Sequence, residues 1–142
     1  MSTPGNFDYS KLKGSDFANM DLSNRSFKGC DLEDAIFDGS NLTNTLIIGS
    51  NLKGASFREC TFDGTNFKGS DLSGLCFDRM TFQGTVFDHT GLKGTSFRNA
   101  VFYDVSVKTE LKNAIFDGSS MDKSTYALLK GFNADVSKVT VI

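Results

Sequence analysis

The residues that most often carry out chemistry in proteins are few in this chain of 142 residues, and they lie far apart. Its single histidine, His89, lies between Asp88 and Thr90 and could act as a general base or a metal ligand, although a solvated histidine at a turn is the simpler interpretation. The three cysteines are Cys30, Cys60 and Cys76. No cysteine–histidine cluster has metal-ligand spacing, and no phosphate-binding loop or pair of nucleophile and base is present. We therefore expect no catalytic, cofactor-binding or metal-binding residues and predict that the protein is not an enzyme.

The elements that position these residues follow from an apolar residue at every fifth position from Phe7 to Val107. A period of five fits neither an α-helix nor a β-strand, so it indicates an internal repeat. Residue types also recur every twenty positions: one series is Leu12, Leu32, Leu52, Leu72 and Leu92, and another is Phe17, Phe37, Phe57, Phe77 and Phe97. A five-residue unit within a twenty-residue period predicts coils with four sides, stacked so that like residues lie above one another.

The positions around each central apolar residue fit this prediction. Two residues before the centre the chain is mostly small, which suits the inside of a narrow coil, and hydroxyl groups there can bond to the backbone. Two residues after the centre, Gly or Asn is common and tolerates the positive φ of a tight turn. Five inward positions carry larger residues instead: Met20, Arg25, Leu75, Met80 and Val105. Since Arg25 cannot be buried alone, we expect it to reach the open N-terminal end or to meet a carboxylate such as Asp8 or Asp31.

Several segments match the unit A(D/N)LXX, among them Ser40-Asn41-Leu42, Ser50-Asn51-Leu52 and Ser70-Asp71-Leu72. On these segments the chain resembles the pentapeptide-repeat proteins, from residue 5 to about 123. The resemblance implies an all-β fold, a right-handed quadrilateral β-helix of about six 20-residue coils. It implies no particular activity, because members of the family do different things.

The C-terminal residues depart from the repeat. Ser124 could cap a short helix from Thr125 to Lys130 that ends at Gly131, followed by one more repeat unit and a β-rich tail. We expect residues 1–123 to form the β-helix and residues 124–142 to cap it within the same domain, since the last coil of a solenoid exposes apolar rings and unpaired backbone. The residues suited to cover that end are Tyr126, Leu128, Leu129 and Phe132. They could form a lid on a monomer, or also join two copies end to end; at the other end, only residues 1–5 are available as a cover.

Any function must come from outward side chains, sorted by the side of the coil on which they lie. The side centred on Leu22 has the most one-signed charge, with Lys123 against four carboxylates: Asp21, Asp63, Asp104 and Asp122. These could form a solvated face or an acidic surface for a basic partner. The side centred on Phe17 alternates Asp38, Arg58, Asp78, Arg98 and Asp117, which predicts a ladder of ion pairs.

An apolar pair offers a second candidate surface. Leu46 and Ile48 flank the central Ile47, so both should point outward, and together they could anchor a protein contact. The net charge of −2 argues against direct binding of nucleic acid, and no apolar stretch reaches the length of a membrane span. Cys30 and Cys60 fall at inward positions and Cys76 at an outward one, which fits free thiols in a reducing cytoplasm.

The leading hypothesis is a non-enzymatic scaffold without a cofactor, which binds a protein partner of unknown identity through a flat side. The alternative comes from resemblance to quinolone-resistance pentapeptide proteins, dimeric rods that mimic DNA and inhibit or protect type II topoisomerases. B-DNA carries one charge per ~1.7 Å of its axis, and four carboxylates on one side are sparse by comparison.

Overall fold

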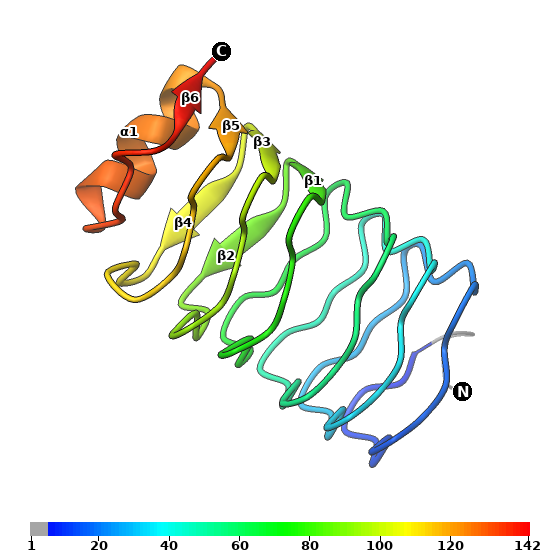
Figure 1. The fold of residues 1–142 in the computed structure, drawn as a ribbon. Helices are drawn as coiled ribbons and strands as arrows, with labels where there is room; N and C mark the ends of the chain where they lie inside the picture. Colours follow the sequence, from blue (N-terminus) through cyan, green and yellow to red (C-terminus); the bar gives the residue numbers. More distant parts are fainter. Residues whose placement is uncertain (1–5) are drawn as a thin grey trace.

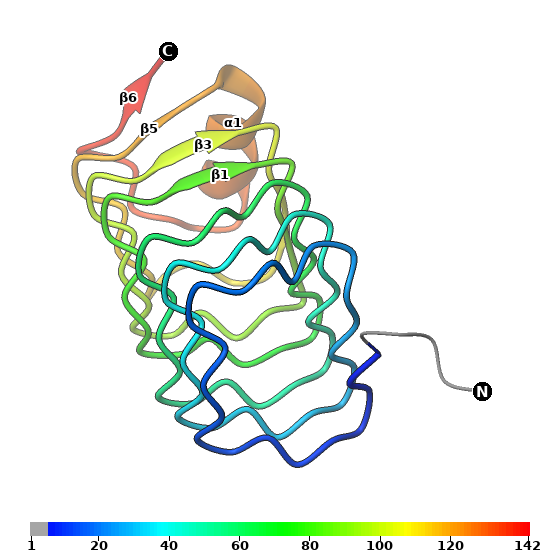
Figure 2. The ribbon, with the colours of Figure 1, turned by 90° about the vertical axis from the view of Figure 1, so that its right-hand side faces the viewer.

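The computed structural model describes residues 6–142, so the predicted N-terminal cover of residues 1–5 lies outside the described residues. The chain winds into a rod of stacked coils, seen from the side in Figure 1 and obliquely from its N-terminal end in Figure 2. Parallel bridges join residues 20 positions apart, as from Ser26 to Leu46 and from Leu46 to Asn66. The twenty-residue period of the sequence is therefore the register of a parallel ladder, which confirms the predicted all-β, four-sided helix.

Continuous strands occur toward the C-terminal end. One sheet has the order β1-β3-β5-β6 and comprises β1 (Thr81–Gln83), β3 (Val101–Tyr103), β5 (Ser120–Met121) and β6 (Thr140–Val141). The other sheet pairs β2 (Val86–Asp88) with β4 (Ser106–Lys108). The helix α1 (Lys123–Gly131) lies at the C-terminal end of the rod, where it contacts β4 (Figure 1). Each side of the rod is named here by its central residue in the first turns: Leu12, Phe17, Leu22 or Phe27.

The core consists of columns of like side chains along the rod. The rings of Phe37 and Phe57 stack with centroids 4.9 Å apart and planes 1° apart. Neighbouring columns meet edge to face, as Phe27 does with Phe37 at 5.9 Å and 84°. Such aromatic contacts contribute about 0.5–1.5 kcal/mol each beyond the burial of area. The central positions predicted from the period of five are thus the core of the protein.

Hydroxyl groups at the inward small positions tie each coil to the coil before it. Thr65 Oγ1 donates a 2.7 Å hydrogen bond to the carbonyl of Leu42, 23 residues earlier. The same bond is made by Thr45, Ser50, Ser70, Thr85, Thr90 and Thr95. Cys30 and Cys60 donate from Sγ in the same way, at 3.0 Å each. The prediction that these small residues lie inside the coil is therefore confirmed. Their hydroxyl groups donate hydrogen bonds to backbone carbonyls inside the rod.

The helix α1 begins earlier than the sequence suggested. Its N-cap is Asp122, whose Oδ1 accepts a 3.2 Å hydrogen bond from the N–H of Thr125. The prediction that Ser124 caps a helix starting at Thr125 is therefore wrong, because the carboxylate two residues earlier already bonds the N–H of the first turn. Gly131 is the last helical residue rather than the residue after it.

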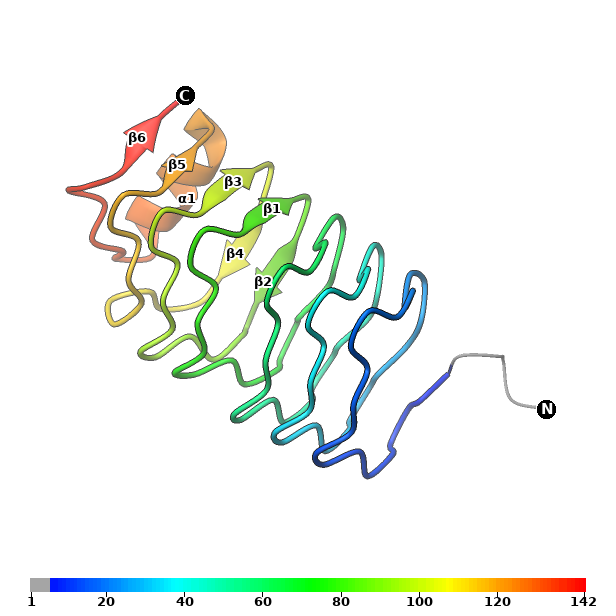
Figure 3. The same ribbon diagram turned by 45° about the vertical axis from the view of Figure 1, so that its right-hand side comes forward.

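The parallel ladder is interrupted between residues 52–62 and residues 72–82. On the Phe17 side no backbone hydrogen bond or bridge joins these two stretches, although the coils before and after are joined there. The gap reaches into the Leu22 side, where the coils are joined again by the hydrogen bond from the N–H of Gly64 to the carbonyl of Gln83, at 2.9 Å. The ladder continues on the Phe27 side, from Leu46 to Asn66 and on to Val86. We call this place the open joint. Figure 3 shows that the coils lie farther apart along one edge there than in the neighbouring turns.

Candidate interaction surfaces of the rod

Three of the four carboxylates predicted to form an acidic surface are exposed on the Leu22 side: Asp21, Asp63 and Asp104. Asp21 accepts hydrogen bonds from the hydroxyl and the N–H of Ser23, which hold the pKa of its carboxyl below the ordinary value. The three do not share one row. Asp21 is in register with Asn41, Asp63 follows a central residue, and Asp104 is at a corner with φ of 52°. The structure thus brings them to one side as separate charges.

The fourth carboxylate, Asp122, has a structural role. Its Oδ2 accepts hydrogen bonds from the N–H of Asp104 at 3.0 Å and from Ser124 Oγ at 3.2 Å, while Oδ1 caps α1. Burial raises the pKa of this carboxyl, but the hydrogen bonds outweigh it and the pKa lies below the ordinary value. Since both oxygens have partners within the protein, Asp122 is poorly suited to bind anything else.

The apolar pair lies on the Phe27 side. Leu46 and Ile48 are half-buried rather than fully exposed, and half-buried Val86 lies two coils further along the same register. Lys28 and Lys68 hold the positions equivalent to Ile48 on the coils before and after. The pair therefore forms a small apolar patch flanked on both sides by a positive charge.

The four residues predicted to cover the C-terminal end divide into two groups. Leu129 is only 1% exposed, and Tyr126 and Phe132 pack against the core while remaining half-buried. The carbonyl of Phe132 accepts a 2.9 Å hydrogen bond from the N–H of Leu111. Leu128 is instead 37% exposed, and it shares this end of the rod with the exposed Ile142.

The predicted ladder of ion pairs on the Phe17 side is not formed. Asp38 Oδ1 accepts hydrogen bonds from Ser56 Oγ at 2.6 Å and from the N–H of Arg58 at 2.9 Å, so the carboxylate bonds the next coil directly and not the guanidinium. We call this arrangement an Asp–Ser bracket, and it recurs with Asp8 and Asp78. Asp88 accepts the hydroxyl bond alone, from Ser106. Within residues 6–142 the only ion pair joins Lys138 to Asp117, at 3.9 Å. A short carboxylate reaches the hydroxyl and the N–H above it, and the sequence pattern of charges did not reveal this.

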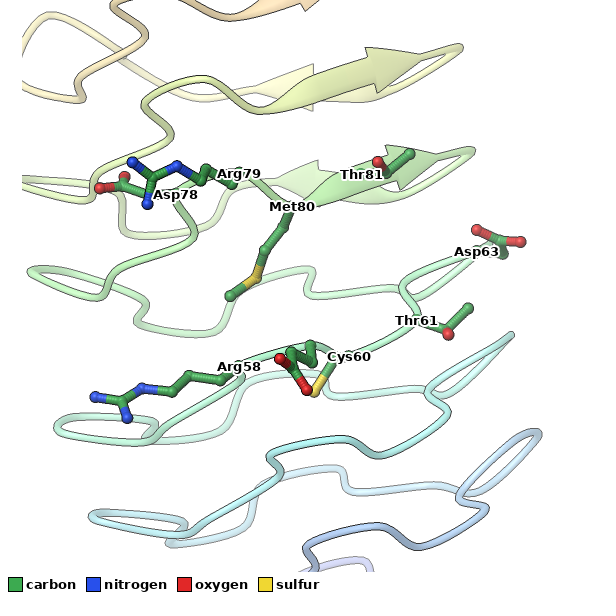
Figure 4. A pocket seen from close by; sticks show the side chains of 9 residues that line it. Arg58, Cys60, Thr61, Asp63, Asp78, Arg79, Met80 and Thr81 are labelled. Carbon is green, nitrogen blue, oxygen red and sulfur yellow. The ribbon is translucent and has the colours of Figure 1, made fainter.

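A cleft of about 480 Å³ lies at the open joint, and sequence reasoning missed it. Arg58, Cys60 and Asp63 line it from one coil, and Met80 and Thr81 from the next. Figure 4 shows the Met80 side chain extending toward the coil that carries Cys60. The signal that could have found the cleft is the presence of two large residues at consecutive inward positions.

The described residues hold no group of three or more His, Cys, Asp and Glu placed to bind a metal ion. His89 is exposed at a corner of the coil, with φ of 54°. Within the same part of the chain, no helix has the length and apolar character needed to cross a membrane.

A parallel ladder with a twenty-residue register and five residues to a side defines a four-sided β-helix. Residues 10–87, more than half of the chain, match the family model described as "Pentapeptide repeat region". The chain therefore belongs to the pentapeptide-repeat family, whose fold is the right-handed quadrilateral β-helix.

Solved pentapeptide repeat proteins are among the structures similar to this chain. Trypsin-treated QnrB1, a plasmid-mediated fluoroquinolone resistance protein, is 14% identical over 95% of this chain and 88% of its own, with a TM-score of 0.48. A pentapeptide repeat protein from the Arabidopsis thaliana thylakoid lumen is 21% identical over 87% and 76%, with a TM-score of 0.40. Rfr23 from the cyanobacterium Cyanothece 51142 is 20% identical over 82% and 67%, with a TM-score of 0.39. At these values the likeness concerns the fold alone, and no curated protein matches the sequence.

Proposed function

We propose that this protein is a non-enzymatic scaffold that binds a partner protein through the Phe27 side of its β-helix. The observation that carries this proposal is the placement of Leu46 and Ile48 on one coil, with Lys28 and Lys68 on the coils before and after. A central apolar contact with a polar rim is the usual composition of a protein interface. The partner offers an apolar side chain to the pair and carboxylates to the lysines.

A double variant, Leu46→Ser with Ile48→Lys, tests this proposal. It copies Ser26 and Lys28, which hold the same two positions one coil earlier, so the fold should be retained. Proteins captured by the native rod from its own cells should be depleted at least tenfold on the double variant in quantitative mass spectrometry. The control is Ile36→Ser, which removes an exposed apolar residue on the Phe17 side and copies Ser56 of the next coil. Equal capture by the double variant would rule out the Phe27 side.

The exposed carboxylates on the Leu22 side support a second candidate, an inhibitor or protector of a type II topoisomerase that acts by mimicking DNA. Three separate charges are sparse against the one charge per ~1.7 Å of B-DNA, which is why the scaffold is preferred. A DNA gyrase supercoiling assay, with and without a fluoroquinolone, separates the two. Inhibition or drug protection at low micromolar protein, lost when Asp21, Asp63 and Asp104 are all replaced by Ser, would favour mimicry. No effect at tens of micromolar would exclude it.

In the same proposal, α1 and the tail that follows it cap the C-terminal end of the solenoid. Burial of Leu129 and the hydrogen bond between Phe132 and Leu111 support this role. The exposed Leu128, together with the unpaired outer edge of β6, could also hold a second copy end to end. Sedimentation of the native chain and of Leu128→Lys decides this point: a dimer that the variant dissociates supports end-to-end assembly, and a native monomer leaves a cap alone.

The three cysteines are free, which is usual in a reducing compartment, so the proposed location is the cytoplasm. Fractionation of cells that express a tagged chain tests it. Recovery from an oxidising compartment would contradict the proposal.

A further inference from the structure

The open joint separates coils whose cores still touch. Across it the rings of Phe57 and Phe77 lie 5.5 Å apart but are tilted by 32°, whereas those of Phe37 and Phe57, one coil earlier, are tilted by 1°. The next column behaves alike, with Phe62 and Phe82 at 4.9 Å and 27°. The ring stacks are thus disturbed at the joint but not broken. Because the backbone ladder is continuous on the Phe27 side and absent on the Phe17 side, the gap between the coils is a wedge and not uniform.

Two large side chains account for the wedge. Leu75 and Met80 occupy consecutive inward positions, where most other coils have a small residue, and Leu75 is only 7% exposed. Neither can donate the hydrogen bond that Thr65 Oγ1 gives to the carbonyl 23 residues earlier. Their bulk holds residues 72–82 away from residues 52–62, and the backbone ladder between the two stretches is lost.

The other oversized residues have no such effect. Met20 is exposed and Arg25 is half-buried, and both lie in the first turns, where no described coil lies beneath them. Val105 is a single replacement, and the adjoining backbone bond from the N–H of Gly84 to the carbonyl of Tyr103 is intact. Two large residues in succession, with a described coil beneath both, therefore distinguish the open joint from the rest of the rod.

A side-chain hydrogen bond between the coils is also missing at the joint. Asp–Ser brackets cross the coil junction before it, from Asp38 to Ser56, and the junction after it, from Asp78 to Ser96. At the joint itself the equivalent residues are Arg58 and Cys76, so no bracket can form. The Phe17 side thus lacks both its backbone ladder and its side-chain bond at one junction.

We propose that the open joint is a hinge, at which the two parts of the rod bend about the Phe27 side. On that side the ladder is continuous, with hydrogen bonds from the N–H of Ile47 to Asn66 and from the N–H of Phe67 to Val86. The stacked rings tolerate a change of tilt because offset aromatic contacts have a broad range of geometry. Bending opens and closes the cleft of about 480 Å³ and changes the direction of one end of the rod relative to the other.

Distance distributions between spin labels test the hinge. The chain first has its three cysteines replaced by serine, which can make the same inward bonds, and is then labelled in pairs. One pair, Ala18 and Arg98, spans the joint on the open Phe17 side; the control pair, Lys28 and Lys108, spans it over as many coils on the Phe27 side. The open-side distribution should be at least twice as wide as the control. Equal widths would overturn the hinge.

A closing variant, Leu75→Thr with Met80→Ser, provides the complementary measurement. It installs residue types found at the same inward positions, Thr95 and Ser40. The variant should narrow the open-side distribution to the control width, and an unchanged distribution would overturn the hinge.

Amide hydrogen exchange on the native chain needs no variant. The N–H groups of Phe57, Glu59 and Phe62 should exchange at least tenfold faster than those of Phe37, Gly39 and Leu42. The latter three lie one coil earlier and donate to carbonyls of the following coil. Equal protection of the two sets would contradict the open ladder on which the hinge depends, even if the closing variant fails to fold.

Discussion

The carboxylate of Asp122 accepts a hydrogen bond from the backbone N–H of Asp104, one coil earlier, while it caps α1 through the N–H of Thr125. One side chain thus fastens the C-terminal helix to the solenoid. Asp122→Ala should lower the free energy of unfolding in urea by about 1–2 kcal/mol, because it removes an N-cap and leaves a backbone donor without its partner.

Asp63→Ala is the matched control for this variant. Asp63 is exposed on the same side, its side chain makes no hydrogen bond within residues 6–142, and its replacement should change stability by less than about 0.5 kcal/mol. Asp122→Asn should retain most of the stability, since Asn is also a good N-cap. Similar losses for Asp122→Ala and Asp63→Ala would contradict the structural role of Asp122.

Stability should fall in acid because several carboxyls have pKa values below the ordinary one in the folded chain: Asp8, Asp71, Asp78 and Asp122. In Asp8, Asp78 and Asp122 burial acts in the opposite direction, but hydrogen bonds from hydroxyl and N–H groups outweigh it. A depressed folded pKa stabilises the fold above the unfolded pKa, near about 3.9, and the contribution is lost as the pH falls through the folded pKa. Urea midpoints should therefore be level near neutral pH and decrease below about pH 4. A midpoint that rises in acid would refute this.

The inward hydroxyl bonds can be tested one at a time. Thr65→Val keeps the shape of a buried side chain but removes the 2.7 Å hydrogen bond to the Leu42 carbonyl, and it should cost about 1 kcal/mol. Thr61→Val in the same coil is exposed and should be neutral within about 0.5 kcal/mol. If thermal and urea unfolding rank the two variants equally, the inward hydroxyls contribute no net stability.

The cysteines should differ sharply in reactivity. Burial raises the pKa of the Cys30 and Cys60 thiols, and both donate inward to a backbone carbonyl, whereas Cys76 is exposed. At pH 8 a thiol reagent should modify Cys76 rapidly, Cys60 more slowly and Cys30 only after denaturation, as measured by mass spectrometry of the labelled peptides. Rapid labelling of Cys30 would show that its coil opens readily. Labelling of Cys60 at an intermediate rate is expected, since it lines the open joint.

Much of this architecture could be predicted because the same residue types recur at equivalent positions of the repeat, where each coil needs the same packing and the same hydrogen bond. Three successive members of one inward series, Thr45, Thr65 and Thr85, are identical in sequence and make the same bond in the structure. Single events were harder to predict. Asp122 competes with Ser124 for the N-terminus of α1, and only the backbone geometry decides between them.

The charges and the joint were missed for a related reason. The alternation of Asp38 and Arg58 predicts an ion pair only if both side chains turn toward each other. The carboxylate instead accepts hydrogen bonds from the nearer hydroxyl of Ser56 and N–H of Arg58. Phe57 and Phe77 are as regular in sequence as their neighbours, so the central residues conceal the lost ladder. The ladder is lost because Leu75 and Met80 are both large and follow each other at inward positions. A single large residue such as Val105 is accommodated without loss of the ladder.

The missing ladder has a mechanical consequence. In a solenoid the backbone hydrogen bonds between coils run along the rod, so tension applied to its two ends loads them directly. The junction between residues 52–62 and residues 72–82 has fewer of these bonds than its neighbours, so we expect the stretched rod to yield there first. Each coil then pulled free contributes roughly 70 Å of extended chain, which makes this protein extensible from its middle outward.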